Sequence, residues 1–180
     1  YTHRHEPGYF MIRLKHPSGF VSAEQFREIA KVAQELNKGF IDITTREDTQ
    51  LHWCHMKDCL TILQRLQKVG VTTSGACGDI MRNITGCPVA GVDKHEYFDA
   101  TPILQKINHY MTGRPEFSNL PRKYKICISG CRDWCSLPEI NCVSLVGAER
   151  RVNGSVEPGF DLRVGGGLST VPMLSQRLGA

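Results

Sequence analysis

Alternation of apolar and polar side chains predicts three strands near the start of the chain. Residues 10–15, 40–46 and 50–53 each change character at every second position. Because successive side chains of a strand point to opposite faces, each segment has one face suited to a core and one polar face. The polar positions are Arg13, Lys15, Asp42, Thr44, Arg46, Gln50 and His52.

Two stretches with helical spacing separate these strands. Residues 22–38 begin with Ser22 and Gln25 in a capping-box arrangement, residues 60–69 have the same period, and a short strand follows at residues 71–73. The order βαββαβ is the ferredoxin-like plan, with both helices on one side of an antiparallel sheet. The polar positions then gather on the other side. That side is either ordinary solvated surface or a surface that receives a polyanion.

The rest of the chain predicts a second region of mixed α/β structure. Its predicted elements are a helix at 101–111, strands at 124–129, 143–146 and 160–164, and a short helix from 172 to 178. The strands are expected to form one sheet. We therefore predict an α+β chain with a ferredoxin-like half-domain at residues 1–74 and a mixed α/β domain at residues 75–180.

The predicted strand at residues 124–129 and the chain just before it carry an unusual row of charge. Alternation places Lys123, Lys125 and Cys127 on one face, opposite the apolar face of the strand. Adjacent lysines repel each other, so the row is explained if an anion lies over them. The alternative is a solvated edge strand, for which exposed lysines are common.

Two glycine-rich stretches add candidate anion sites. Residues 74–91 have Arg82 and Asn83 at their centre, and residues 165–170 precede the last predicted helix. Glycine lets the backbone approach a ligand closely, and free backbone amides can bind an anion. Both stretches are equally compatible with ordinary loops. Neither contains the phosphate-binding patterns GxGxxG or GxxxxGK[ST].

Composition and net charge limit the kinds of ligand and cellular environment that we expect, but they do not indicate a specific function. The chain has 180 residues, of which 41% are apolar, and a formal net charge of +4 from scattered basic residues. This charge favours a small acidic ligand over nucleic acid. There is no long apolar run and no signal-like N-terminus, so we expect a soluble cytoplasmic protein with no membrane partner. Because the chain begins without Met, we expect either a fragment or a piece chosen for expression.

The eight cysteines leave two interpretations open. They do not form the paired CxxC pattern of a structural zinc site. Cys127, Cys131 and Cys135 are evenly spaced, and with Cys142 they could ligate an iron–sulfur cluster in a small electron-transfer module. The other interpretation is that they are reduced and mostly buried thiols, which behave as small hydrophobic side chains.

Several motifs together resemble the siroheme-dependent nitrite and sulfite reductases over nearly the whole chain. They occur in the family's order and are Phe10-Met-Ile-Arg13, Thr44-Thr-Arg46, Gln50-Leu-His52, Gly78-Asp-Ile-Met-Arg-Asn83, Leu120-Pro-Arg-Lys-Tyr-Lys125 and Val164-Gly-Gly-Gly-Leu-Ser169. Members of the family resemble tandem duplications, and this chain is similar to the first half. The second half carries the cluster cysteines in the family, so we assign no metal ligand to this chain.

The resemblance implies an activity, cofactors and partners. It implies a six-electron reduction of sulfite to sulfide or of nitrite to ammonia, with siroheme and a 4Fe-4S cluster as cofactors. A ferredoxin-type protein would donate the electrons, and the C-terminal half of the same enzyme or a second copy would complete the site. The fragment is expected to be inactive alone. The alternative, besides the cluster module, is a tetrapyrrole-binding dimer without catalysis.

The resemblance also implies residue roles. The residues expected to surround the substrate anion are Arg13, Arg82, Lys123 and Lys125. The residues expected to contact siroheme are Thr44, Arg46, Gln50, His52, Asn83 and Arg122. Two positions differ among members of the family. Asp42 stands where some relatives have a basic residue, and Lys125 matches the sulfite-reducing pattern, which favours sulfite over nitrite as the substrate.

Overall fold

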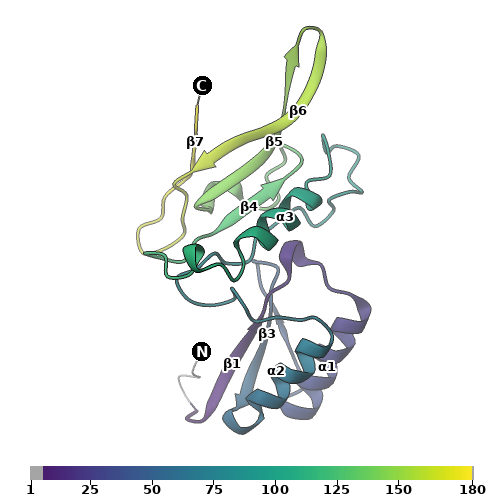
Figure 1. Cartoon of the computed structure of the whole chain (residues 1–180), viewed down its shortest axis with the longest axis vertical. Helices are drawn as coiled ribbons and strands as arrows, with labels where there is room; N and C mark the ends of the chain where they lie inside the picture. The colour runs from purple at the N-terminus through teal and green to yellow at the C-terminus, as the bar shows by residue number, and fades with distance from the viewer. Residues whose placement is uncertain (1–5, 180) are drawn as a thin grey trace.

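Two sheets, each with its own hydrophobic core, follow one another along the long axis of the molecule (Figure 1). The computed structural model describes residues 6–179. The N-terminal part contains a three-stranded antiparallel sheet in the order β1-β3-β2. Its elements are β1 (Tyr9–Leu14), η1 (Pro17–Gly19), α1 (Ala23–Leu36), β2 (Asp42–Ile43), β3 (Thr49–His55), η2 (Met56–Asp58) and α2 (Cys59–Lys68).

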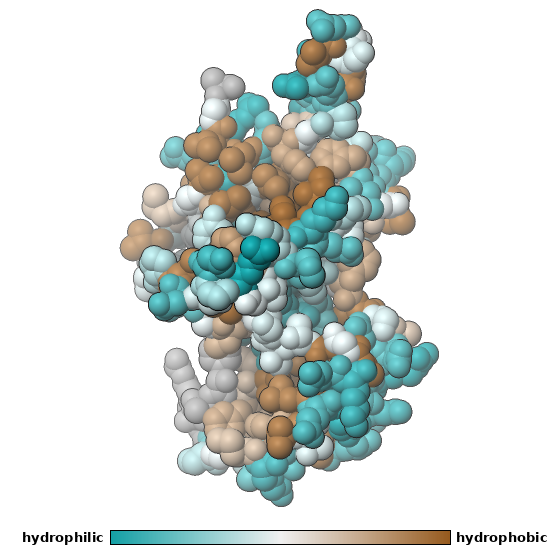
Figure 2. All heavy atoms as spheres, viewed as in Figure 1, coloured by the Kyte–Doolittle hydropathy of each residue, from teal (hydrophilic) through white to brown (hydrophobic). Residues whose placement is uncertain are grey.

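The N-terminal part confirms the ferredoxin-like plan, with α1 and α2 on one side of the sheet (Figure 1). Ser22 and Gln25 form the predicted capping box at the start of α1, each side chain accepting from the other's backbone N–H. The predicted strand at 71–73 is reduced to one bridge, in which Thr72 pairs with Lys15. The outer surface over the two helices is mainly hydrophilic (Figure 2).

Apolar side chains from the sheet and both helices form the first core. Its fully buried members include Leu14, Leu51, Cys54, Ile29, Val32, Ile62 and Leu66. Burying a large aliphatic side chain stabilises a fold by about 1.5–3 kcal/mol before entropy is counted, so this core is what holds the helices on the sheet. The polar alternate positions of the strands are left on the opposite side.

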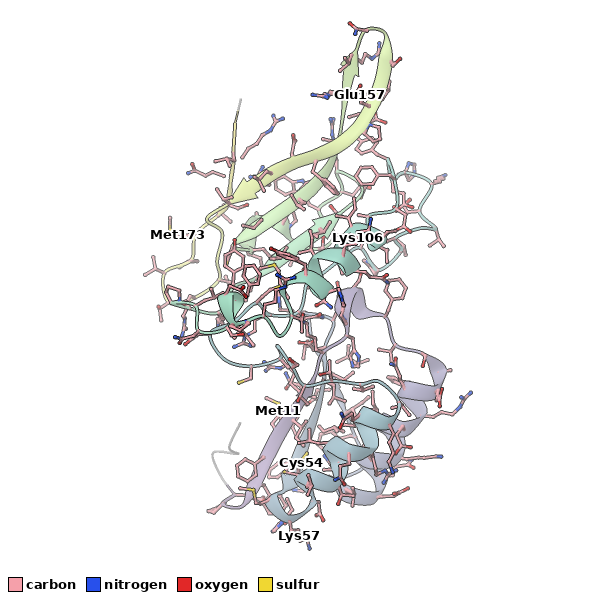
Figure 3. The ribbon with its side chains drawn as sticks, viewed as in Figure 1. Met11, Cys54, Lys57, Lys106, Glu157 and Met173 are labelled. Carbon is pink, nitrogen blue, oxygen red and sulfur yellow. The ribbon has the colours of Figure 1, made fainter. Side chains whose placement is uncertain are left out.

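A β-bulge near the end of β3 interrupts the predicted alternation of core and solvent positions. Ile12 pairs with Leu51 but Phe10 pairs with Cys54, so β3 contains one extra residue. Trp53 has a positive φ of 63° there, and Cys54 takes the core position that alternation gave to Trp53 (Figure 3). The indole instead lies under the ammonium group of Lys38, 3.5 Å from the ring centroid.

The C-terminal part contains a four-stranded sheet in the order β4-β5-β6-β7, and the β4–β5 pair is parallel. Its elements are α3 (Thr101–Met111), η3 (Pro115–Phe117), β4 (Ile126–Ser129), η4 (Pro138–Ile140), β5 (Val143–Val152), β6 (Ser155–Val164) and β7 (Gln176–Arg177). Its core joins Leu104 of α3 to Ile126 and Ile128 of β4 and to Met81 and Ile84 of the glycine-rich segment. The mixed α/β class predicted for this part is confirmed.

Strands β5 and β6 form a hairpin that projects beyond the rest of the sheet (Figure 1). Asn153 and Gly154 close it with positive φ angles of 51° and 84°, as expected for an Asn-Gly hairpin turn. Sequence periodicity predicted only the inner parts, because the outer residues are exposed on both faces and carry no apolar alternation. Glu157 marks this outer part in Figure 3.

The predicted helix from 172 to 178 is wrong. This segment is extended, and Gln176–Arg177 pairs with β6 as β7. The guanidinium of Arg163 donates to the hydroxyl and carbonyl oxygens of Ser175, and the Ser175 N–H donates to Glu139 O at 2.7 Å. These long-range bonds stabilise an extended backbone where local sequence favoured a helix. The anion site expected at a helix N-terminus there is therefore absent from the described residues.

None of the helices within residues 6–179 combines the length and the apolar character needed to cross a lipid bilayer.

Candidate functional site

A cavity of about 180 Å³ between the two parts of the molecule collects most of the predicted site residues. Its walls come from β1, from the turn between β2 and β3, from β3, from the glycine-rich segment and from the chain entering β4. The lining residues are Arg13, Thr44, Arg46, Asp48, Gln50, Arg82, Lys123 and Lys125. Cations from four separate segments thus face one small space.

The turn at residues 44–48 is organised by the hydroxyl group of Thr44. Its Oγ1 accepts from the backbone N–H groups of Arg46 and Asp48 at 3.3 and 3.2 Å. The Thr44 N–H in turn donates to Asp48 O at 2.9 Å, which closes the turn. Because the hydroxyl accepts these bonds, its own hydrogen stays available to donate towards an acceptor in the cavity.

Arg13 and Arg82 are held beside each other by one carbonyl group. Each donates from Nη1 to Ala76 O at 3.1 Å, and Arg82 Nε also donates to Gly78 O at 2.9 Å. Gly78 has a φ of 91°, which other residues rarely adopt. Two guanidinium groups on one oxygen repel each other, so the arrangement favours an anion between them.

Backbone pairing places Arg82 next to the lysine segment. Its N–H donates to Tyr124 O at 2.8 Å, and the Tyr124 N–H donates to Ile80 O at 3.0 Å. Since Tyr124 points to the core side, the flanking Lys123 and Lys125 face the cavity. Burial and the neighbouring charges of Arg46 and Lys123 lower the pKa of Lys125.

The guanidinium of Arg46 forms hydrogen bonds between the two parts of the molecule, and one of its N–H groups has no hydrogen-bond acceptor. Its Nη1 donates to Asn141 Oδ1 and its Nη2 to Ile126 O, both at 2.9 Å. Its Nε is buried and has no hydrogen-bond partner. Burial lowers the pKa of the guanidinium. An unpaired buried donor is costly, so Arg46 is poised to bind an acceptor at the edge of the cavity.

Two buried ionisable residues, one in the cavity lining and one outside it, were not among the predicted site residues. Asp48 lines the cavity, is 3% exposed, and has a pKa raised to about 6 by burial. Its alternation in phase with Thr44, Arg46 and Gln50 could have revealed it. Lys15 is also 3% exposed, donates from Nζ to Thr112 Oγ1 at 3.0 Å, and has a pKa lowered to about 8 by burial.

His52 does not line the cavity, but it is linked to it through Gln50. Its Nε2 lies 3.0 Å from Asp42 Oδ2 and 3.1 Å from the Gln50 amide. When the amide oxygen of Gln50 faces Arg13, it accepts from Nε and Nη2 at 3.1 Å. The strand register places Arg13, Gln50 and Asp42 in one row across the sheet. Asp42 therefore contacts an imidazole.

Asn83 and Arg122 also lie outside the cavity lining. Asn83 is fully buried, and its side-chain N–H donates to His16 O at 2.7 Å and to Arg46 O at 3.0 Å. It therefore positions the backbone of Arg46. Arg122 is exposed on the surface, one residue before the lysine row.

The thiols do not form a metal site. All eight cysteines are free, and the thiol of buried Cys127 donates to Ser136 Oγ at 3.0 Å. Within residues 6–179, no three or more Cys, His, Asp or Glu side chains are arranged to hold a metal ion. The geometry gives no support to the alternative of a cluster held by Cys127, Cys131, Cys135 and Cys142. Cys127 is buried on β4, whereas Cys135 lies in an exposed turn.

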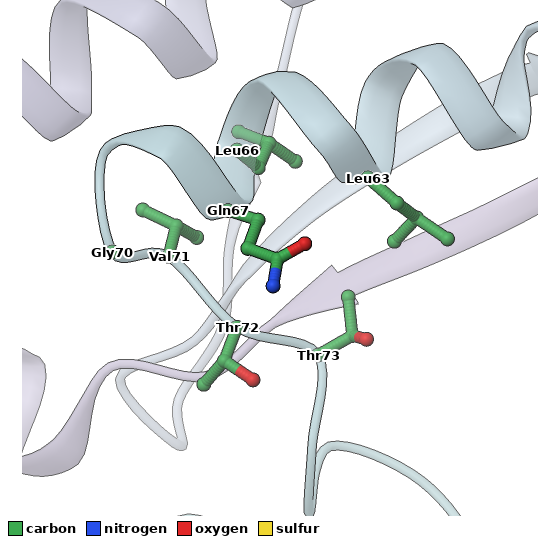
Figure 4. A pocket seen from close by; sticks show the side chains of 7 residues that line it. All are labelled: Leu63, Leu66, Gln67, Gly70, Val71, Thr72 and Thr73. Carbon is green, nitrogen blue, oxygen red and sulfur yellow. The ribbon is translucent and has the colours of Figure 1, made fainter.

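Other hollows lack the chemistry of the cationic cavity. One of about 340 Å³ lies at the end of α2 (Figure 4) and is lined by Leu63, Leu66, Gln67, Gly70, Val71, Thr72 and Thr73. None of these side chains is charged. A wider hollow of about 830 Å³ lies along α3; its basic residues Lys106, His109 and Arg114 are exposed to solvent, and Arg114 stacks on Tyr110. We therefore take the cationic cavity as the candidate site.

Comparison with known proteins identifies the family that each part of the chain matches. Residues 1–69 match the family described as the nitrite/sulfite reductase ferredoxin-like half domain. Residues 77–180 match the family described as the nitrite and sulphite reductase 4Fe-4S domain.

Named relatives and solved structures give the same result. The chain is 42% identical over 175 residues to the assimilatory ferredoxin-dependent nitrite reductase of Haloferax mediterranei, covering 92% of this chain and 30% of that protein. It is 41% identical over 175 residues to a sulfite reductase [ferredoxin] of Mycobacterium tuberculosis, covering 97% and 31%. The chain thus spans less than a third of the length of these curated relatives.

The solved structure of Mycobacterium tuberculosis NirA superposes with a TM-score of 0.85 at 41% identity, over 94% of this chain and 30% of that one. Dissimilatory sulfite reductase I has a TM-score of 0.77 at 12% identity, over 94% and 57%, which shows a shared fold. Both parts of the chain match the same group of proteins. The chain therefore belongs to the nitrite and sulfite reductase family.

Proposed function

We propose that this chain is the N-terminal part of a ferredoxin-dependent reductase that converts sulfite to sulfide or nitrite to ammonia. The observation that carries the proposal is the convergence of Arg13, Arg46, Arg82, Lys123 and Lys125 on one cavity. Concentrated positive charge of this kind, partly removed from water, binds a small anion and stabilises charge that develops during reaction.

The donor set fits siroheme, whose many carboxylates need hydrogen-bond donors and cations. The buried unpaired Nε of Arg46 and the hydroxyl hydrogen of Thr44 are suitable donors, and Gln50 adds an amide. When bound, siroheme and a linked 4Fe-4S cluster supply the electron transfer. The cluster ligands are expected from a second half of the enzyme, because no group of three or more Cys, His, Asp or Glu side chains within residues 6–179 is arranged to hold a metal ion.

The chain's own residues would bind and orient the substrate and deliver protons. Arg13 and Arg82 are suited to bidentate recognition of an oxyanion, since their guanidinium groups lie side by side. Lys123 and Lys125 add point charges. The lowered pKa of Lys125 also makes its ammonium a better proton donor to a substrate oxygen that gains electron density.

Relatives named as ferredoxin-dependent reductases support a ferredoxin-type electron donor. The C-terminal half of the same enzyme, or a second copy, is proposed to complete the cofactor site. Eight free thiols are typical of a reducing compartment, so we propose a cytoplasmic location.

Charge removal at the lysine row tests the proposal. In the full-length protein that carries this chain, the double variant Lys123→Gln/Lys125→Gln should lower kcat/KM for sulfite and nitrite by about 100-fold or more, measured with reduced methyl viologen. Lys106→Gln removes a charge from the outer face of α3 and serves as the matched control (Figure 3). Equal losses in both variants would contradict a role specific to the cavity.

The isolated 180-residue chain provides a second test. We expect it to show neither siroheme absorption nor viologen-driven reduction, because part of the cofactor site would be missing. Gel filtration with siroheme titration separates this from the tetrapyrrole-binding dimer, which predicts a pigmented dimer. Reductase activity of the isolated chain would overturn the assignment as a part of the site.

A further inference from the structure

Asp48 is the one carboxylate among the described residues that line the cationic cavity. An ionised carboxylate in an anion site weakens binding of the anion, so its position calls for a physical explanation. It is not an exposed side chain that could swing away, because it is 3% exposed and its backbone is fixed in the turn at Thr44. The carboxyl group remains close to whatever occupies the cavity.

Charged groups approach Asp48 from every element packed against it. Arg13 lies on β1, Lys15 directly follows β1, and Arg46 belongs to the same turn as Asp48. The positive charge of each favours the ionised form of Asp48. Across the cavity lie Arg82, Lys123 and Lys125. The backbone N–H of His16 donates to Asp48 Oδ1 at a long 3.3 Å, while the His16 ring lies 2.9 Å from Thr49 Oγ1.

The neighbouring carboxyl group of Glu47 is oriented differently. Both of its oxygens accept from the Gly86 N–H at 3.2 Å, and it is not part of the cavity lining. Burial raises its pKa to about 7. Adjacent residues thus provide two carboxyl groups whose pKa values are raised by burial, of which one faces the anion site and one does not.

Despite the cations around it, burial holds the pKa of Asp48 at about 6. The group is therefore ionised at neutral pH but close to taking up a proton. A bound anion would add repulsion and offset the cations that now favour the carboxylate. By linkage, an anion that raises the proton affinity of Asp48 must bind more tightly to the protonated form.

We propose that Asp48 takes up a proton from solvent when an anion binds in the cavity, so that substrate and proton enter the site together. The step is an acid–base reaction, in which a carboxylate and a solvent proton form a carboxylic acid, with no change in oxidation state. The proton then resides on the Asp48 carboxyl group, which lines the same cavity as the bound anion. This inference rests on the proposed function of the cavity as an anion site.

Calorimetry with sulfate tests the proposal, because sulfate keeps its charge across the relevant pH range. Titrations of the full-length protein at pH 6.5 in two amine buffers with different ionisation enthalpies give the number of protons taken up. If sulfate raises the pKa of Asp48 by about one unit, we expect uptake of about half a proton per sulfate at pH 6.5. We also expect sulfate affinity to fall roughly sixfold between pH 5.5 and pH 7.5.

Two isosteric variants separate Asp48 from its neighbour. Asp48→Asn should abolish uptake and bind sulfate at pH 7.5 as tightly as the unaltered protein does at pH 5.5. Glu47→Gln, the matched control, should retain most of the uptake. The inference is overturned if the unaltered protein binds sulfate without proton uptake, or if Asp48→Asn retains it. Absence of any sulfate binding would instead overturn the proposed anion site.

Infrared spectroscopy gives a readout that needs no variant to fold. Adding sulfate to the unaltered protein at pH 6.5 should produce a new carbonyl stretch of a neutral carboxyl group. Labelling with ¹³C-carboxyl aspartate should shift this band, whereas labelled glutamate should not. A difference spectrum without a neutral carboxyl band, under conditions where calorimetry shows sulfate bound, would contradict the proposal.

Discussion

Cations gather in two regions of this molecule, and the two regions treat them in opposite ways. On the helical surface, Arg65 of α2 contacts Glu28 and Glu35 of α1 at 2.6 Å each, and these carboxylates raise the pKa of its guanidinium. In the cavity, Arg13 and Arg82 share the carbonyl of Ala76. There, burial and neighbouring cations lower the pKa of Lys125.

The two regions therefore contain two kinds of cation. The first is stabilised by neighbouring carboxylates, and the second is positioned to bind an anionic ligand. The carboxylates around Arg65 leave little affinity for an external anion. The carbonyl oxygens of Ala76 and Gly78 position Arg82 without neutralising it, so its charge remains available to a ligand. Matched substitutions in the two regions should therefore have opposite effects on stability and on activity.

The largest effect is expected for Arg82→Gln. Removing a guanidinium that stabilises developing negative charge should lower kcat/KM for sulfite or nitrite by about 10²–10³-fold. Folding should be unaffected, because the lost contacts are to the carbonyls of Ala76 and Gly78 at the surface of the cavity. Steady-state kinetics and thermal unfolding of the full-length protein measure both. A loss below threefold would contradict a role in substrate binding.

Lys15→Met tests the cost of a buried cation. The pKa of Lys15 is lowered from 10.5 to about 8, so the unfolded chain binds the proton more tightly than the folded one. Stability should therefore rise with pH between about 8 and 10.5, and the variant should lack this rise. At pH 7 we expect the variant to be more stable by on the order of 2 kcal/mol.

Chemical denaturation as a function of pH checks this expectation. A variant that is less stable than the unaltered protein at pH 7 would mean that the hydrogen bond from Lys15 to Thr112 outweighs the burial of the charge.

Lys125→Met should sharpen the contrast between stability and binding. Because Arg46 and Lys123 repel the Lys125 ammonium, its removal should stabilise the protein by about 0.5 kcal/mol at low salt, with less gain at high salt. Sulfate affinity should fall at the same time. Denaturant titrations at two salt concentrations, combined with calorimetry, measure the two effects. Loss of stability at low salt would show that the cations are not in mutual repulsion.

The smallest effect on binding and activity is expected for Arg65→Gln. The partly exposed ion pairs with Glu28 and Glu35 should contribute about 0.5–1 kcal/mol to the free energy of unfolding, screened by salt. Reductase activity should be unchanged, in contrast to the same substitution at Arg82. Activity that falls in parallel in both variants would remove the distinction between the two regions.

Local periodicity predicted the elements whose two faces differ in polarity. Helix α1 was marked by its capping box and its apolar stripe, and β1 by alternation. The β5–β6 hairpin was under-predicted because its outer half is exposed on both faces. The last segment was taken for a helix, since nothing local indicates that Arg163 and Glu139 hold it extended through Ser175.

The sequence by itself determined the residue types of the site and, for Arg13 and Gln50, the strands that present them, because a period of two fixes which side chains share a face. The other lining residues lie in turns and connecting segments, where this period does not apply. Only the tertiary structure decided which of them meet. Pairing of the glycine-rich segment with Tyr124 places Arg82 beside the lysines, while packing takes Asn83 into the interior. The tertiary structure also sets the pKa values of Asp48 and Lys15. Burial of a charged group raises its energy, and the extent of burial cannot be read from position in the sequence.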